Sequence, residues 1–127
     1  MYITSKDDGL TWSAPVKLPD GILGPIKNQP IQLENGTILS PTSTESKKDG
    51  WRIYLEISND QGQTWSKTKF LNDGKQFGAI QPSILNYGNG KLQLLSRTDK
   101  EVITENWSED SGTTWSRMEA TNLPNPN

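Results

Sequence analysis

Hydrophobic and polar residues alternate in several short segments of this chain, with a period of two residues. Ile53, Leu55 and Ile57 alternate with Tyr54 and Glu56, which is typical of a β-strand that faces a core on one side. No segment shows a helical stripe with capping residues, so the chain is predicted to be all-β. Further short strands are expected over residues 14–18, 37–40, 67–71, 91–95, 102–104 and 117–120.

One eight-residue phrase, Ser-x-Asp-x-Gly-x-Thr-Trp, occurs three times and begins at residues 5, 58 and 108. The same five residue types recur in each copy, and the copies are almost evenly spaced along the chain, which indicates an internal repeat. In such a phrase the Asp and Ser side chains can accept backbone N–H groups within a tight turn, while Gly supplies a positive φ. The phrase residues expected to be structural are Ser5, Asp7, Gly9, Trp12, Ser58, Asp60, Gly62, Trp65, Ser108, Asp110, Gly112 and Trp115.

A calcium-binding loop is the competing interpretation of this phrase, because each copy carries an aspartate. One fixed carboxylate per copy is too few for a calcium site made entirely of protein ligands. The phrase is therefore predicted to be the turn of a β-hairpin, and no metal is expected.

The segments between the phrases are also repeated. Residues 29–31 and 81–84 both begin with Gln-Pro, and each is followed by a hairpin signal, at 34–36 and 87–90. Four short antiparallel strands in about 50 residues are typical of a β-propeller blade. The chain is thus predicted to be a single partial propeller domain of about two and a half blades. Its parts are a half blade at residues 1–25 and blades at 26–73 and 79–123.

Composition excludes several functions. The formal net charge is −2, which argues against a surface that wraps a nucleic acid. No apolar run is long enough to span a membrane, and no signal peptide is visible, so the localisation stays open. The chain has no Cys and no His, which excludes disulfides, thiolate metal sites and His-based catalytic triads. No cofactor is expected.

The repeated phrase is the Asp-box, or BNR repeat, and the chain resembles the sialidase-like BNR-repeat proteins. The segments that carry the resemblance, besides the three Asp-boxes, are residues 18–28, 80–85 and 123–127. The resemblance covers essentially the whole chain and matches the middle blades of that family. It implies a fragment of a six-bladed propeller, or one completed by several copies, and a parent protein of the exo-sialidase or neuraminidase type.

The resemblance also implies site residues. Sialidases hold the substrate carboxylate with three arginines and use a Tyr nucleophile activated by a Glu, with an Asp as acid/base. Arg97 resembles one of the three arginines, at the end of the second strand of a blade. Gln81 stands where the family has its Glu, and an amide cannot take a proton from a phenol. The Tyr and the Asp belong to blades outside this chain.

One repeat earlier, a shift of 52 residues places Glu45 at the position of Arg97 and Gln29 at that of Gln81. Glu45 and Gln81 are therefore the candidate catalytic residues, and Arg97, Lys27 and Asn28 are the candidate substrate-binding residues. In a blade, the connections from strand two to three and from strand four to the next blade emerge on the ligand face. The Asp-boxes join strands three and four, so they are expected on the opposite face.

Two functions remain open at this stage. The first is a part of a sialidase-like glycoside hydrolase that acts on terminal, acidic sugars of glycans. The alternative is a non-catalytic propeller fragment that binds glycan or protein. The isolated chain is expected to be inactive, because the catalytic groups act as a unit. It is also expected to self-associate, because its open blade faces would expose apolar surface.

Overall fold

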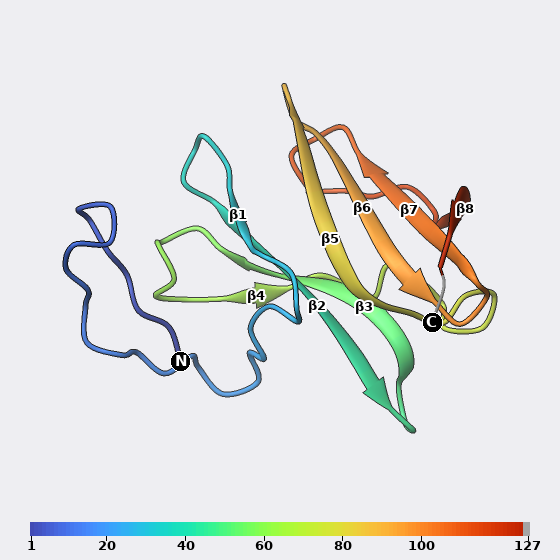
Figure 1. Cartoon of the computed structure of the whole chain (residues 1–127), viewed down its shortest axis with the longest axis horizontal. Helices are drawn as coiled ribbons and strands as arrows, with labels where there is room; N and C mark the ends of the chain where they lie inside the picture. Colours follow the sequence, from blue (N-terminus) through green and yellow to red (C-terminus); the bar gives the residue numbers. More distant parts are fainter. Residues whose placement is uncertain (126–127) are drawn as a thin grey trace.

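The computed structural model of the chain describes residues 1–125 and contains two four-stranded antiparallel sheets (Figure 1). Pro126 and Asn127, the end of the 123–127 segment that resembles the family, lie outside the described residues. The first sheet has the strand order β1 (Ile31–Gln32), β2 (Ile38–Ser46), β3 (Gly50–Ser58), β4 (Ser66–Lys67). The second has the order β5 (Ala79–Gly88), β6 (Lys91–Thr98), β7 (Val102–Ser108), β8 (Glu119–Pro124).

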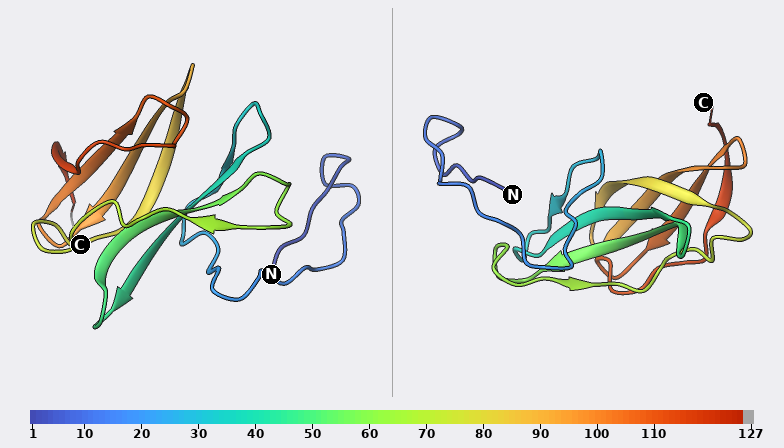
Figure 2. Two further views of the ribbon diagram at one scale, coloured as in Figure 1. Left: turned by 180° about the vertical axis from the view of Figure 1, so that it is seen from behind. Right: turned by 90° about the horizontal axis from the view of Figure 1, so that it is seen from below.

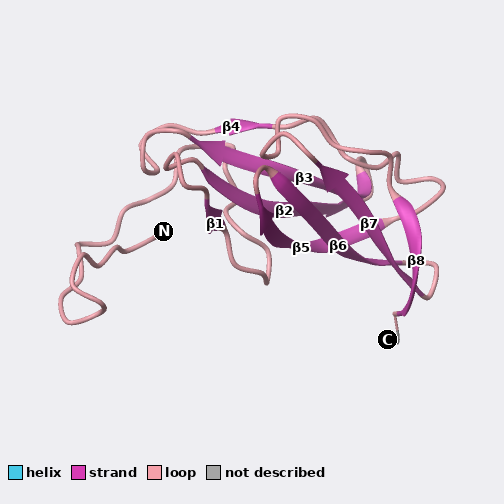
Figure 3. Cartoon of the chain, turned by 90° about the horizontal axis from the view of Figure 1, so that it is seen from above, coloured by secondary structure: helices cyan, strands magenta, loops and turns pink. Residues whose placement is uncertain are grey.

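The described residues contain strands, turns and loops but no helix (Figure 3). The all-β prediction is confirmed, and so is the arrangement as four-stranded antiparallel sheets whose strands follow one another along the chain. The fourth strands differ from those expected: β4 is confined to Ser66–Lys67, and β8 runs over Glu119–Pro124 rather than 117–120. Past Lys67 the chain leaves the regular ladder, although Thr68 and Leu71 still donate backbone hydrogen bonds to Leu55 and Ile53.

A hairpin closed by the isolated bridge between Tyr2 and Val16 precedes the first sheet and stands apart from it in the views of Figures 1 and 2. Tyr2 and Val16 exchange two backbone hydrogen bonds of 2.8 Å, and Ser13 donates another to the carbonyl oxygen of Thr4. The hydroxyl of Tyr2 reaches the carbonyl oxygen of Gly62 at 3.3 Å. This contact joins the first Asp-box hairpin to the second Asp-box.

The main core lies between the two sheets. Leu39, Ile53 and Leu55 of the first sheet belong to one buried cluster with Leu92 and Leu94 of the second. Burial of each such side chain contributes about 1.5–3 kcal/mol relative to an exposed position. This apolar interface therefore fixes the sheets against one another and sets the spacing of the loops at their ends.

Strand β3 is buried on both faces, which the alternation of residues 53–57 did not predict. Tyr54 and Glu56 were expected to be the outward residues of a half-buried strand, but both are buried. The reason is that the segment after the first hairpin covers this face. The Glu56 carboxylate accepts backbone N–H groups from Leu23 at 2.9 Å and Gly24 at 2.8 Å.

The strand pairing also corrects the repeat alignment. Ile38 is opposite the Asp-box residue Ser58, and Leu92 is opposite the equivalent Ser108. Ile38 and Leu92 therefore occupy equivalent positions in the two blades. They are two residues farther apart in the sequence than the 52 residues that separate the two Gln-Pro dipeptides. The Gln-Pro match misaligns the blades because Ile38 follows Gln29 by nine residues, whereas Leu92 follows Gln81 by eleven.

This register changes which residues share a position in the two blades. Arg97 is equivalent to Ser43 and not to Glu45. Gln81 lies in the register shift between Ile80 and Ser83, so the pairing gives it no one-to-one counterpart in the first blade. Lys27 and Gln81 both have a left-handed backbone, with φ of 66° and 54°, which is uncommon for residues other than Gly.

Candidate functional site

Gln81 lies near the start of β5 with its side chain against β6. The guanidinium nitrogen Nη1 of Arg97 donates a hydrogen bond of 3.0 Å to Gln81 Oε1. Arg97 is opposite Ile80 in the β5–β6 pair, and the register shifts between Ile80 and Ser83. Such a bulge re-aims a side chain within an otherwise regular ladder, and here it accompanies the contact between Gln81 and Arg97.

The first blade holds the backbone of Gln81 from the other side. The amide nitrogen Nδ2 of Asn28 donates to the carbonyl oxygens of Gln81 at 2.9 Å and Pro82 at 3.1 Å. The N–H of Gln81 donates to the hydroxyl oxygen of Ser43 at 3.3 Å. The strand entries of two successive blades are therefore hydrogen-bonded to each other at this edge.

Lys27 lies next to Asn28 and, like Gln81, has a left-handed backbone. It is exposed, whereas Gln81 and Arg97 are partly buried. Non-Gly residues in left-handed backbone cost free energy, and such residues cluster at binding sites. The structure thus brings Lys27, Asn28, Gln81 and Arg97 to one edge of the sheets, with two side chains that carry positive charge.

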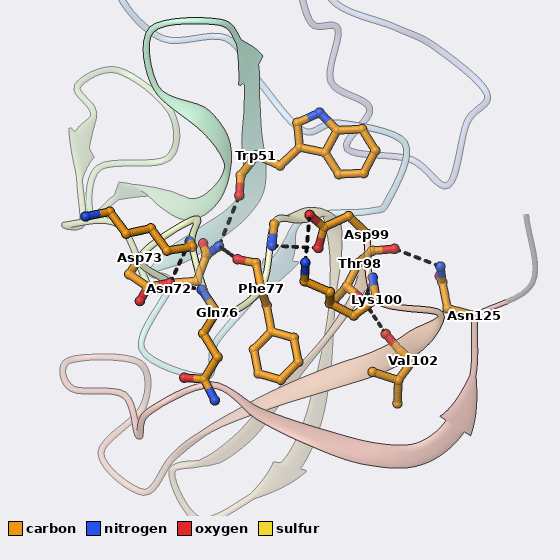
Figure 4. Close-up of polar contacts among 12 residues, drawn as sticks. Trp51, Asn72, Asp73, Gln76, Phe77, Thr98, Asp99, Lys100, Val102 and Asn125 are labelled. Atoms are coloured by element: carbon orange, nitrogen blue, oxygen red, sulfur yellow. Dashed lines mark hydrogen bonds and ion pairs between the residues drawn. The ribbon is translucent and has the colours of Figure 1, made fainter.

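A network of hydrogen bonds fixes the loops next to the sheet edge that carries Gln81 and Arg97 (Figure 4). Asp99 Oδ1 accepts the N–H of Gly78 at 2.9 Å, and the N–H of Asp99 donates to the carbonyl oxygen of Gly78 at 3.0 Å. A Cβ atom on Gly78 would lie 2.9 Å from Asp99 Oδ2 and 3.2 Å from Trp51 Cβ. A side chain at this position, three residues before Gln81, would require Asp99 and Trp51 to shift.

Two asparagines extend the network shown in Figure 4. Asn72 Nδ2 donates to the carbonyl oxygens of Trp51 at 3.0 Å and Phe77 at 2.9 Å, which ties the connection between the blades to β3. Asn125 Nδ2 donates to the carbonyl oxygen of Thr98 at 2.9 Å. The loops on both sides of the Arg97 strand are therefore fixed by buried or partly buried amide groups.

Glu45 lies elsewhere on the same sheet end. It is exposed near the end of β2, opposite Trp51 in the β2–β3 pair. Among the described residues, no hydrogen bond joins Glu45 to Gln81 or Lys27. The catalytic roles of Glu45 and Gln81 remain predictions, and so does substrate binding by Arg97, Lys27 and Asn28.

The Asp-boxes lie at the other end of the sheets, because Ser58 and Ser108 pair with Ile38 and Leu92 near the start of β2 and β6, whereas Arg97 is near the end of β6. In the third box, Asp110 Oδ1 accepts the N–H of Thr114 and the hydroxyl of Ser108, each at 2.8 Å. The same hydrogen bonds recur in the first and second boxes. The aspartate oxygens therefore act as hydrogen-bond acceptors within the turn.

These hydrogen bonds lower the pKa of the box aspartates. The Thr114 hydroxyl and N–H, together with the Ser108 hydroxyl, lower the pKa of Asp110 to about 2. Asp7 and Asp60 have lowered pKa values for the same principal cause, a hydrogen bond from the Thr four residues later. A carboxylate held in its charged form in this way is a poor general acid at neutral pH.

Sequence reasoning missed the buried polar residues that join the blades. Glu56, in addition to its two backbone bonds, accepts the hydroxyl of Thr42 at 3.2 Å. Asn106, in the equivalent place on β7, donates to the carbonyl oxygens of Leu71 at 3.2 Å and Ser116 at 3.1 Å. Nothing in the local pattern distinguishes these side chains from outward polar residues, because their partners are distant backbone groups.

Within residues 1–125, no group of three acidic, His or Cys side chains is placed to hold a metal ion. The same residues form no helix with the length and hydrophobicity needed to cross a membrane.

Solved structures similar to this chain share its fold. A protein of unknown function from Dyadobacter fermentans DSM 18053 has a TM-score of 0.74 and 21% identity, over 96% of this chain and 38% of that chain. The K499G mutant of NanB sialidase from Streptococcus pneumoniae has a TM-score of 0.71 and 23% identity, over 94% of this chain and 18% of that chain. No curated protein shows significant similarity. The chain thus spans well under half the length of either of these structures.

The likeness to the sialidase supports the interpretation of the two sheets as blades of a propeller fragment. The sequence itself matches the description "BNR repeat-like domain" over residues 1–127, and this match includes all three Asp-boxes. The chain therefore belongs to the BNR repeat-like domain family.

Proposed function

We propose that this chain is part of a sialidase-like glycoside hydrolase that acts on terminal acidic sugars of glycans. The observation that carries the proposal is the contact of Arg97 with Gln81, next to Asn28 and Lys27, at the edge of the sheets opposite the Asp-boxes. A guanidinium can bind a carboxylate through two parallel hydrogen bonds. A sugar carboxylate would replace the neutral Gln81 amide as one partner of Arg97, and Lys27 would add positive charge.

Gln81 favours a second candidate function, a non-catalytic domain that binds glycan or protein. An amide can accept a hydrogen bond but cannot serve as a general base. Hydrolysis needs a nucleophile, its base and an acid that converge on one anomeric carbon. These groups would come from parts of a longer protein, and the 127-residue chain alone is expected to bind without turnover.

Binding of sialic acid and its methyl ester to the chain tests the site. The two ligands differ in the charge of the carboxyl group, so loss of Arg97 should weaken the acid far more than the ester. For Arg97→Ala we expect a loss of about tenfold or more in affinity for the acid, in line with the removal of a charge-assisted pair. Lys48→Ala, which removes a positive charge from the exposed β2–β3 turn, is the matched control.

Titration calorimetry or NMR chemical-shift changes would report the affinities. Equal and small effects of the two substitutions would mean that Arg97 is only a surface residue. Turnover of a fluorogenic sialoside by the chain alone would instead show that the catalytic groups lie within these residues, contrary to the proposal.

A further inference from the structure

A pocket of about 340 Å³ is lined by two connections that belong to different sheets. The connection between β4 and β5 supplies residues 70–73 and 76–77, and the connection between β7 and β8 supplies Arg117 and Met118. Neither Gln81 nor Arg97 is part of the lining, so the pocket is separate from the site proposed above. Pockets of about 300–1,000 Å³ hold small molecules, and the size of this one restricts its occupant to a small ligand.

Hydrogen bonds hold the two connections in place. Asn106, a buried residue of β7, donates through Nδ2 to the carbonyl oxygens of Leu71 at 3.2 Å and Ser116 at 3.1 Å, and so joins one connection to the other. Asn72 Nδ2 donates to the carbonyl oxygen of Phe77 at 2.9 Å within the β4–β5 connection (Figure 4). A pocket whose walls are fixed in advance loses little conformational entropy when a ligand binds.

Two opposite charges, Asp73 and Arg117, line this pocket, and Gln76 contacts both. The Gln76 N–H donates to Asp73 Oδ1 at 3.0 Å, while Gln76 Oε1 accepts a hydrogen bond of 2.8 Å from Arg117 Nη2. The N–H groups of Lys75 and Gln76 lower the pKa of Asp73, which keeps its carboxylate charged at neutral pH. Within residues 1–125, no salt bridge joins Asp73 or Arg117 to another charge. Both charges can therefore pair with a ligand.

Aromatic side chains form the apolar part of the lining. Phe70 is 39% exposed. The Arg52 guanidinium lies 4.4 Å from the centroid of its ring, and the ring of Tyr54 packs edge-on at 5.8 Å. Phe77 is partly buried and packs against the core of the two sheets. Because aromatic rings offer a large apolar contact area, the occupant is expected to carry an apolar group next to its charged groups.

We propose that this pocket binds a free α-amino acid with an apolar side chain. The ligand carboxylate would accept hydrogen bonds from the Arg117 guanidinium, and its ammonium group would pair with Asp73. Its side chain would pack against Phe70 and Phe77. A free amino acid carries both charges on neighbouring atoms, whereas each end of a peptide carries only one of them. A simple carboxylate would add negative charge beside Asp73, and a simple amine would add positive charge beside Arg117, so neither complements the pocket as well.

Binding of L-phenylalanine, its carboxamide and its N-acetyl derivative to the whole chain tests this assignment. The carboxamide lacks the negative charge of the amino acid, and the N-acetyl derivative lacks the positive charge. At ligand concentrations of about 1–10 mM, the NMR shifts of the Asn72, Gln76 and Met118 amides should saturate with L-phenylalanine. Both analogues should bind about fivefold more weakly, because each loses one pair of exposed charges.

Two substitutions assign each ligand charge to its partner. Arg117→Gln should weaken binding of L-phenylalanine about fivefold and leave that of the carboxamide unchanged. Asp73→Asn, which keeps an acceptor for the N–H groups of the loop, should weaken L-phenylalanine about fivefold and leave the N-acetyl derivative unchanged. Lys75→Gln is the matched control, because Lys75 is exposed, charged and outside the lining. It should leave all three affinities unchanged.

Unchanged β6 resonances in every variant show that the sheets are folded. With those resonances in place, the proposal is overturned if the pocket amides show no saturable shift, or if the amino acid and its analogues bind equally. An equal loss of affinity in Lys75→Gln would overturn it too, because a general charge effect would then explain the result. Loss of binding in Arg97→Ala would place the amino acid at the Arg97 site instead and would also overturn the proposal.

Discussion

Ser58 and Ser5 make the same hydrogen bonds in surroundings that differ in burial. Each hydroxyl accepts the N–H of the box glycine at 2.8 Å and donates to the box aspartate. Ser58 and Gly62 are buried, whereas Gly9 is exposed and Ser5 is partly exposed. The sequence predicted all three turns from residue type alone, but it could not predict which of them is covered, because the cover comes from distant segments.

Ser58→Ala is therefore expected to destabilise the chain more than Ser5→Ala. Loss of the Ser58 hydroxyl leaves the buried Gly62 N–H without its partner, at a cost of about 1–3 kcal/mol. In the first box, water can replace the hydroxyl, so the loss should be smaller. Urea denaturation of the two variants and the parent chain measures the difference, and equal losses would contradict the role assigned to burial.

The third box predicts a pH dependence. The folded-state pKa of Asp110 is lowered to about 2, while an unfolded Asp titrates near 3.9. Its contribution to stability is therefore fully present above the unfolded pKa and is lost as pH falls through the folded pKa. We expect Asp110→Asn to flatten the decline in thermal midpoint between about pH 4 and pH 2. A decline of unchanged slope in this variant would remove Asp110 as a source of it.

At the scale of elements, the buried Glu56 joins β3 to the connection after the first hairpin. Glu56→Gln keeps the size of the side chain but replaces one acceptor oxygen with an NH₂ group that faces a backbone N–H. We expect faster amide exchange at Leu23 and Gly24, because each now donates to Glu56. Glu119→Gln, at an exposed position of β8, is the control. Unchanged exchange at Leu23 and Gly24 would mean that other contacts hold the connection.

The elements also show where sequence reasoning reaches its limit. Strand alternation and the Asp-boxes predicted the strands and their turns, because both are local. The equivalence of Arg97 with Ser43 depends on how β2 pairs with β3. The two Gln-Pro dipeptides carry no information about that pairing. Three of the candidate residues named from the sequence, Asn28, Gln81 and Arg97, lie together in the structure, whereas the hydrogen bond between Gln81 and Ser43 was not predicted.

At the scale of the molecule, the outer face of the second sheet has a polar centre where the equivalent face of the first sheet is apolar. The Tyr87 hydroxyl donates to Gln93 Oε1, and Gln93 Nε2 donates to Glu105 Oε2, both at 2.7 Å. By the strand register, Gln93 and Glu105 are equivalent to Leu39 and Leu55 of the core. Tyr87 is 57% exposed on this face. The cost of desolvating the Glu105 carboxylate should limit self-association through this face.

The double variant Gln93→Leu with Glu105→Leu should therefore self-associate more strongly than the parent chain. It gives the outer face the residues that the first sheet uses to bind the second, and burial of each leucine contributes about 1.5–3 kcal/mol. Sedimentation should show association at concentrations at least about tenfold lower, which corresponds to about 1.4 kcal/mol. The control, Glu119→Leu with Asn122→Leu, adds the same hydrophobic groups to exposed positions of β8. If the control associates at equally low concentrations, association reflects added hydrophobicity alone. If only the Gln93→Leu, Glu105→Leu variant does so, Gln93 and Glu105 keep this face from packing as a blade interface.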